Sequence, residues 1–125
     1  MAQEVEAADE FIGLLFMSRD VAHREHLRTS SYAAHKALNK FYEGVIELAD
    51  SFAEAYQGRF NRLLDIPLLD NRNDGEIADV LQSHCDWIEE NRTAICPKTE
   101  TAINNIIDEI VALYYSTLYK LRFLS

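Results

Sequence analysis

The chain has 125 residues, of which 48% are hydrophobic, and this suits one compact domain spanning residues 1–125 rather than two domains. Its 21 acidic residues outnumber its 12 basic ones, which gives a formal net charge of −9. Because Lys and Arg neutralise phosphates when a protein binds nucleic acid, we do not expect this chain to bind DNA. With only 4 Gly and 2 Pro to break helices, the composition favours an all-helical protein.

The sequence predicts neither a membrane segment nor an export signal. No basic start is followed by an apolar run, and no apolar run reaches the roughly 18 residues needed to cross a bilayer. The two cysteines, Cys85 and Cys96, are too far apart for a Cys-x-x-Cys motif, and reduced thiols are the default in a cytosol. We therefore expect a cytoplasmic protein that does not associate with membranes.

Two long helices are predicted in the first half of the chain. Apolar residues recur at helical intervals from about Val5 to Leu27, and again from the Thr29–Ser31 segment to about Leu64. Ser and Thr are good N-caps, so the second helix is expected to begin in that segment. At about 1.5 Å per residue this second helix would be roughly 50 Å long, a length typical of a helical bundle.

Two more helices are predicted in the second half. The third spans about Glu76 to Thr93, and the Ile95–Lys98 segment, which contains a proline, ends it. Thr99 or Thr101 can cap the fourth helix, which is expected to continue to about Leu124. The chain is thus expected to form a bundle of four helices.

Four side chains of the first two helices have the chemistry of a metal site. His23 lies in the first helix, and His35, Asp50 and Glu54 lie in the second. His35 and Asp50 share nearly the same helix face but lie roughly 22 Å apart at 1.5 Å per residue, so they cannot bind one metal within a chain. A second, antiparallel copy of the helix would bring His35 towards Asp50 and Glu54 of that copy. Imidazole and carboxylate ligands suit iron or another divalent first-row metal.

The intervals of 12, 15 and 4 residues that separate His23, His35, Asp50 and Glu54 resemble those of the Dps family of mini-ferritins. The last helix is similar too. Its Lys98–Ala102 opening resembles the family's Asp-x-x-Thr-Ala, and its Leu118–Leu124 end resembles the family's Trp-Met-Leu-Arg closing. These segments cover somewhat over half of the chain. The resemblance implies a ferritin-like four-helix bundle with a long crossover between the second and third helices.

The resemblance also implies an activity, that of a ferroxidase-type oxidoreductase. Ferrous, non-haem iron would bind between subunits, be oxidised by peroxide or oxygen, and be stored as ferric mineral in a homo-oligomeric cage such as a dodecamer. His23 and His35 of one subunit and Asp50 and Glu54 of its mate would be the ligands, with no catalytic residue beyond them. Asn39 stands where the family has an Asp, and would be a weaker ligand. Residues 66–69 would be a reduced form of a short helix across the dimer interface.

Two alternatives stay open. The first is a non-catalytic helical interaction protein with a degenerate metal site, which the amide of Asn39, the short chain and the acidic rather than Lys-rich N-terminus favour. The second keeps the metal, as zinc or manganese, in a structural role between subunits. The remaining histidines, His26 and His84, are predicted to be surface residues.

Overall fold

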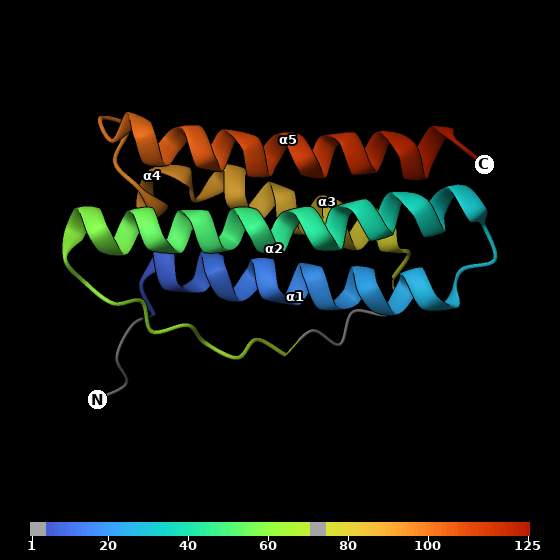
Figure 1. The fold of residues 1–125 in the computed structure, drawn as a ribbon, viewed down its shortest axis with the longest axis horizontal. Helices are drawn as coiled ribbons and strands as arrows, with labels where there is room; N and C mark the ends of the chain where they lie inside the picture. The colour runs from blue at the N-terminus through green and yellow to red at the C-terminus, as the bar shows by residue number, and fades with distance from the viewer. Residues whose placement is uncertain (1–4, 71–74) are drawn as a thin grey trace.

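The computed structural model describes residues 5–70 and 75–125, and among these residues it contains helices and no strand (Figure 1). The helices are α1 (Ala7–Arg28), α2 (Tyr32–Phe60), α3 (Ile77–Glu90), α4 (Arg92–Ile95) and α5 (Thr101–Phe123). The predicted all-helical class and the four long helices are confirmed, whereas the short α4 was not predicted. None of the described helices combines the length and the apolar character needed to cross a membrane.

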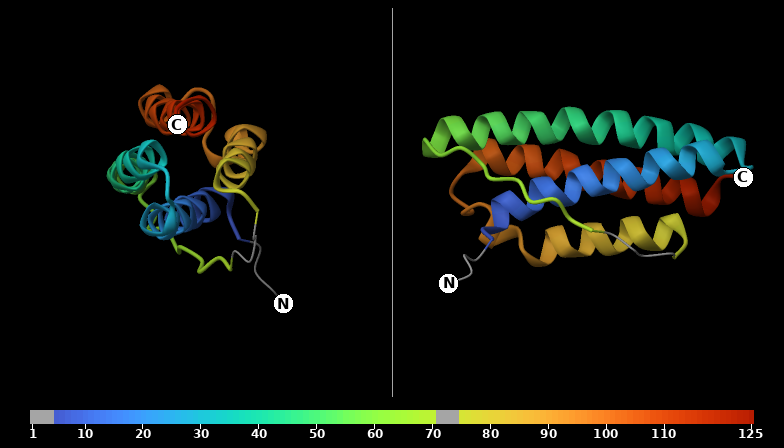
Figure 2. Two further views of the ribbon diagram at one scale, coloured as in Figure 1. Left: turned by 90° about the vertical axis from the view of Figure 1, so that its right-hand side faces the viewer. Right: turned by 90° about the horizontal axis from the view of Figure 1, so that it is seen from below.

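The four long helices lie side by side, with α1 and α5 running in one direction and α2 and α3 in the other (Figures 1 and 2). Helix α1 packs against α2 and α3, and α5 packs against the same two helices. Because α2 ends where α1 begins and α3 starts at the opposite end, the chain crosses the length of the bundle between α2 and α3. The other links between helices, at residues 29–31, 91 and 96–100, are shorter.

The core consists of apolar side chains from all four long helices. Phe11 of α1 meets Phe52 of α2 edge to face with ring centroids 4.9 Å apart, and Phe41 of α2 meets Tyr114 of α5 at 5.0 Å. Burying a large apolar side chain contributes about 1.5–3 kcal/mol, so these contacts dominate the stability of the bundle. The largest fully buried side chains are Tyr114, Phe11, Phe41, Phe52, Ile12, Leu15, Leu38, Leu81, Ile88, Ile95, Ile107 and Ile110.

Local hydrogen bonds fix the helix ends. Ser31 is the N-cap of α2, and its hydroxyl accepts a hydrogen bond from the Ala34 N–H at 3.2 Å, as the sequence predicts. The prediction for α5 is wrong, because its N-cap is Glu100, whose side chain makes no capping hydrogen bond. The Glu100 N–H instead donates to the Pro97 carbonyl, so a backbone turn leads the chain into the helix.

The described part of the crossover, residues 61–70, is extended and lies along α1 (Figure 2). The predicted short helix at residues 66–69 is therefore wrong. Pro67 has no N–H to donate, and its carbonyl oxygen lies so close to α1 that a Cβ placed on Gly13 would be 2.9 Å away. Asn61 begins the crossover in the left-handed conformation, with φ at 53°. The rest of the predicted crossover, residues 71–74, lies outside the described residues, as do residues 1–4 of the acidic N-terminus.

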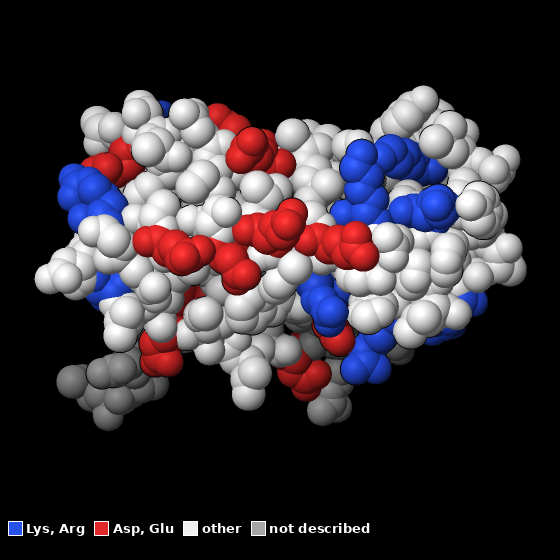
Figure 3. Space-filling view, viewed as in Figure 1, with Lys and Arg blue, Asp and Glu red and all other residues white. Residues whose placement is uncertain are grey.

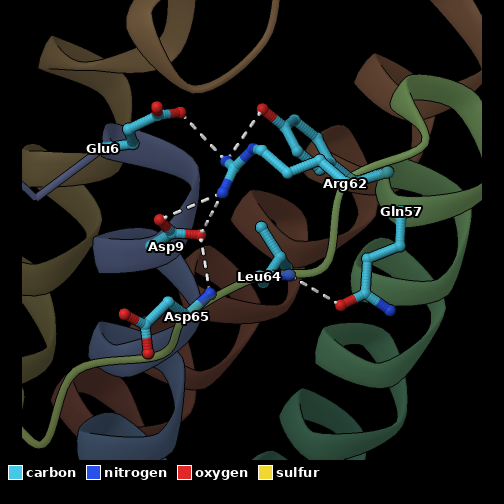
Figure 4. Close-up of polar contacts among 7 residues, drawn as sticks. Glu6, Asp9, Gln57, Arg62, Leu64 and Asp65 are labelled. Carbon is cyan, nitrogen blue, oxygen red and sulfur yellow. Dashed lines mark hydrogen bonds and ion pairs between the residues drawn. The ribbon is translucent and has the colours of Figure 1, made fainter.

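Side chains from α1 and α2 hold the start of the crossover (Figure 4). The buried Asp9 carboxylate accepts hydrogen bonds from the Arg62 guanidinium at 3.1 Å and from the Asp65 N–H at 3.2 Å. Arg62 also pairs with Glu6 at 3.0 Å and donates to the Tyr56 hydroxyl at 3.3 Å. The extended segment lacks the backbone hydrogen bonds of a helix, and these side-chain contacts with α1 and α2 hold it in place instead.

Candidate metal site

Two histidines join the end of α1 to the start of α2. The His26 Nδ1 lies 2.7 Å from the His35 carbonyl oxygen, and the His35 Nδ1 lies 2.9 Å from the His26 carbonyl oxygen. A carbonyl can only accept, so both Nδ1 atoms donate, and each neutral ring keeps its lone pair on Nε2. The two rings stack with centroids 3.8 Å apart at an interplanar angle of 19°. This arrangement fixes both ring orientation and tautomer.

His23 lies next to this pair, on the same seam between α1 and α2. Its ring stacks on Tyr42 with centroids 4.2 Å apart, and its centroid is 6.1 Å from that of His26. Helices α1 and α2 therefore bring His23, His26 and His35 together. The ring that stacks on His35 is that of His26, not that of the predicted ligand His23. His23 and His35 are half-buried, and both keep some contact with solvent.

The prediction that His26 is a surface residue is wrong, because only 8% of it is exposed. A signal was present in the sequence. His26 continues the buried face of α1 that runs through Leu15, Ser18 and Ala22 at intervals of three and four residues. A polar residue on such a face is buried when a hydrogen-bond partner is within reach, and the His35 carbonyl supplies one.

Asp50 and Glu54 lie further along α2 and are exposed. Their apolar neighbours Ala49, Phe52 and Ala53 predict a partly buried face for both carboxylates, and that prediction is wrong. Together with Glu43 and Glu47 they form a row of acidic side chains on the outer face of α2 (Figure 3). Within the described part of one chain, no three His, Cys, Asp or Glu side chains come together as a metal site. A site that uses both histidines and both carboxylates therefore has to draw on two copies of the chain.

Asn39 lies one turn after His35 on α2 and is half-buried. Its side-chain oxygen accepts a hydrogen bond from the Tyr42 hydroxyl at 2.8 Å. Because Tyr42 also stacks on His23, Asn39 helps to hold that histidine in place. Its role within the chain is to orient a neighbouring candidate ligand.

A second polar cluster lies in the core and includes His84, so the prediction that His84 is a surface residue is also wrong. The Tyr114 hydroxyl donates to the Ser18 hydroxyl at 2.6 Å, and the Ser18 hydroxyl shares a hydrogen bond with the His84 Nδ1, also at 2.6 Å. Burial lowers the pKa of His84 to about 4, so the ring is neutral at pH 7. His84 lies four residues after Val80 and four before Ile88 on the buried face of α3, a spacing that could have placed it.

This second cluster joins α1, α3 and α5. Its three members are all buried, and each finds a hydrogen-bond partner among the others. Satisfied polar groups in an apolar core fix how helices align, because any other alignment would leave them unpaired. We assign this cluster to the architecture of the bundle.

The two cysteines are buried and neither forms a disulfide, in line with the expectation of reduced thiols. Burial raises the pKa of Cys85 to about 11, and it also raises the pKa of Cys96. The thiolate is the form that binds metals and attacks electrophiles, so both thiols are held in their inert form.

A family model described as a family of unknown function (DUF5856) matches residues 26–121. An uncharacterized 14.6 kDa protein in the mobD-ri intergenic region of Enterobacteria phage T4 is 30% identical over 114 residues, which are 91% of this chain and 87% of the phage protein. No solved structure matches the chain. The family match includes His26, His35, Asp50 and Glu54 and begins after His23.

Proposed function

The chain belongs to the DUF5856 family of unknown function, and we propose that it binds ferrous iron between two copies of itself and oxidises it, as the resemblance to the Dps family implies. The observation that carries the proposal is the orientation of His35. Its Nδ1 donates to the His26 carbonyl, which leaves the Nε2 lone pair for a metal. Metal-binding histidines almost always donate their other N–H to a carbonyl or carboxylate in this way.

The carboxylates come from the second copy. Asp50 and Glu54 are exposed and form no ion pair with another described residue, so nothing described in their own chain neutralises them. Two α2 helices packed antiparallel about a two-fold axis near Glu43 bring His35 of each copy to the height of Asp50 of the other. Burying two carboxylates in such an interface is costly unless a cation binds there. Ferrous iron supplies that cation as the substrate.

The helix directions support a ferritin-like topology. Helices α1 and α5 run against α2 and α3, and the long crossover joins the parallel helices α2 and α3, which lie diagonally opposite each other and both pack against α1 and α5. Ferritin-like bundles have one such crossover. Further two-fold and three-fold contacts of this bundle would close a cage such as a dodecamer, in which ferric product is stored.

The proposed reaction is a one-electron oxidation of each iron. Two ferrous ions reduce one hydrogen peroxide molecule, which takes up two protons and leaves as two water molecules. Imidazole nitrogens hold the ferrous ion, and the carboxylates of Asp50 and Glu54 stabilise the ferric product through its higher charge. The ferric ion then hydrolyses and leaves the site as mineral.

Anaerobic addition of ferrous iron followed by peroxide or air tests the proposal. We expect the ferric absorbance in the near ultraviolet to rise in the wild type, and to rise at least tenfold more slowly in Asp50→Ala and His35→Ala. Asp50→Ala is the sharper variant, because the exposed Asp50 side chain forms no hydrogen bond or ion pair with another described residue, whereas His35 also joins the helices. Asp86→Ala, an exposed carboxylate on α3, is the matched control. Wild-type oxidation rates in Asp50→Ala would contradict the proposal.

One observation favours the second candidate, a non-catalytic interaction protein with a degenerate or structural metal site. The side-chain oxygen of Asn39, at the position where the resemblance implies a carboxylate, already accepts a hydrogen bond from Tyr42. A site with fewer anionic ligands holds ferric product less well. Zinc or manganese bound at the dimer interface without any iron oxidation would support this candidate over the first.

A further inference from the structure

Three lysines converge on a groove between the first half of α2 and the last turns of α5. The groove has a volume of about 590 Å³, and its lining includes Lys36, Lys40 and Lys120 together with Tyr32 and Leu124. Figure 3 shows blue side chains gathered over α2 and α5 at the end of the molecule where α2 begins, next to the end of the acidic row. Although the chain has a net charge of −9, the surface around this groove is positively charged.

The three lysines of this groove outnumber its one carboxylate, that of Glu43, within the described part of the chain. None of the three lysines forms an ion pair there, although the Glu43 carboxylate also lines the groove. The Lys36 ammonium lies over the Tyr32 ring, 5.8 Å from its centroid. Burial lowers the pKa of Lys120, and the neighbouring Lys40 ammonium lowers it further. Like charges held together in this way are stabilised when an anion binds between them.

The N-terminus of α2 adds to the positive charge of the groove. Tyr32 and Ala33 form the first turn of this 29-residue helix and line the groove. The N-terminus of a helix carries a partial positive charge, so its dipole favours an anion at the same place as the lysines. Apolar surface lies beside the charge, since Tyr32 is 74% exposed and Leu124 is 46% exposed.

We propose that this groove binds a small phosphorylated ligand with an aromatic part, such as a nucleoside monophosphate. The phosphate lies between the ammonium groups of Lys36, Lys40 and Lys120, and the aromatic part packs on the Tyr32 ring and Leu124. Phosphate binds ammonium groups through charge, and a flat ring gains by stacking on an exposed aromatic side chain. Lys40 follows His35 by five residues, about 140° around the helix, so the phosphate would use other side chains than the iron, although Asn39 and Glu43 also line the groove.

Isothermal titration with adenosine monophosphate, adenosine and inorganic phosphate tests the proposal. We expect saturable binding of the nucleotide, weaker binding of inorganic phosphate and no binding of adenosine. The Lys40→Ala/Lys120→Ala variant should bind the nucleotide at least tenfold more weakly. Lys98→Ala, an exposed lysine outside the groove, is the matched control and should bind normally. Tyr32→Ala should weaken binding of the nucleotide and leave that of phosphate unchanged, because only the nucleotide stacks.

Several results would overturn the proposal. One is no heat of binding with millimolar nucleotide, and another is equal weakening by Lys98→Ala and by the groove variant. Tight binding of single-stranded DNA that the nucleotide does not displace would show a polyanion surface instead. A change in light-scattering mass in the groove variant, with nucleotide affinity unchanged, would assign the lysines to a subunit contact. Nucleotide binding should persist in Asp50→Ala, so this proposal and the iron proposal can fail separately.

Discussion

Ser18 links the polar cluster in the core, because its hydroxyl is hydrogen-bonded to both Tyr114 and His84. Ser18→Ala would leave two buried polar groups without partners, whereas Tyr114→Phe removes one donor and leaves the bond to His84 intact. An unsatisfied buried group costs about 1–3 kcal/mol, so we expect Ser18→Ala to lower the free energy of unfolding by about 2–3 kcal/mol and Tyr114→Phe by about 1 kcal/mol. Urea unfolding measures both, with the exposed Ser83→Ala as control. The reverse order of the two effects would contradict the assigned hydrogen bonds.

The lowered pKa of His84 predicts how the free energy of unfolding depends on pH. Its pKa is about 4 in the folded protein, because burial disfavours the charged ring, against 6.5 as the ordinary value. Between these values the unfolded chain binds the proton more readily, so stability is lost as the pH falls from 6.5 and the loss is complete near pH 4. The difference corresponds to about 3 kcal/mol at 1.36 kcal/mol per pKa unit.

The unfolding free energy of the wild type and of His84→Gln at pH 7 and at pH 4.5 isolates this effect. The variant is expected to be less stable at pH 7 and to lose less stability on acidification, because it lacks the buried imidazole whose pKa folding lowers. Equal pH dependence in the two proteins would show that His84 is accessible to protons in the folded state.

Polar residues were the hardest to place from sequence. Periodicity locates a buried face, and by that rule His26 and His84 belong inside. Their polar side chains favour the surface instead. Whether such a histidine is buried depends on a hydrogen-bond partner elsewhere in the chain, such as Ser18, which lies 66 residues before His84. Asp50 and Glu54 show the opposite error, since a partly buried position was predicted for both and both are exposed. Buried apolar neighbours on a helix do not fix the exposure of the adjacent positions.

At the scale of the elements, two glycines test how the crossover packs. A Cβ on Gly13 would lie 2.9 Å from the Pro67 carbonyl oxygen, whereas a Cβ on Gly58 would meet nothing within 4 Å. Both lie in helices, where Ala is preferred over Gly by about 1 kcal/mol. We therefore expect Gly58→Ala to raise the melting temperature and Gly13→Ala to lower it by forcing the crossover off α1. An equal rise in both variants would mean that the crossover does not press against α1.

The same crossover shows where prediction of elements fails. The four long helices followed from apolar spacing, and Ser31 as a cap followed from its side-chain oxygen. The conformation of residues 61–70 depends instead on Gly13, Asp9 and Gln57, which lie in α1 and α2. A short apolar segment carries no period long enough to distinguish helix from extended chain.

At the scale of the whole molecule, the uneven charge distribution decides how copies can meet. Each chain carries a net charge of −9, so copies repel one another on average, and the acidic row of α2 would be buried in the proposed interface. Bound cations relieve this repulsion. Assembly and metal binding should therefore depend on each other, as expected of a site that neither copy completes alone.

Light scattering, with iron quantified on the same peak, measures this dependence. With ferrous iron we expect a mass near that of a dodecamer and iron in the peak, whereas chelation should shift the mass towards smaller species. Asp50→Ala/Glu54→Ala should keep its helical circular dichroism and elute without iron, because both residues are exposed and contribute no core contact. Asp86→Ala should behave as the wild type. A monomer without metal under all conditions would contradict the site between subunits, and a dimer without metal would favour the interaction protein.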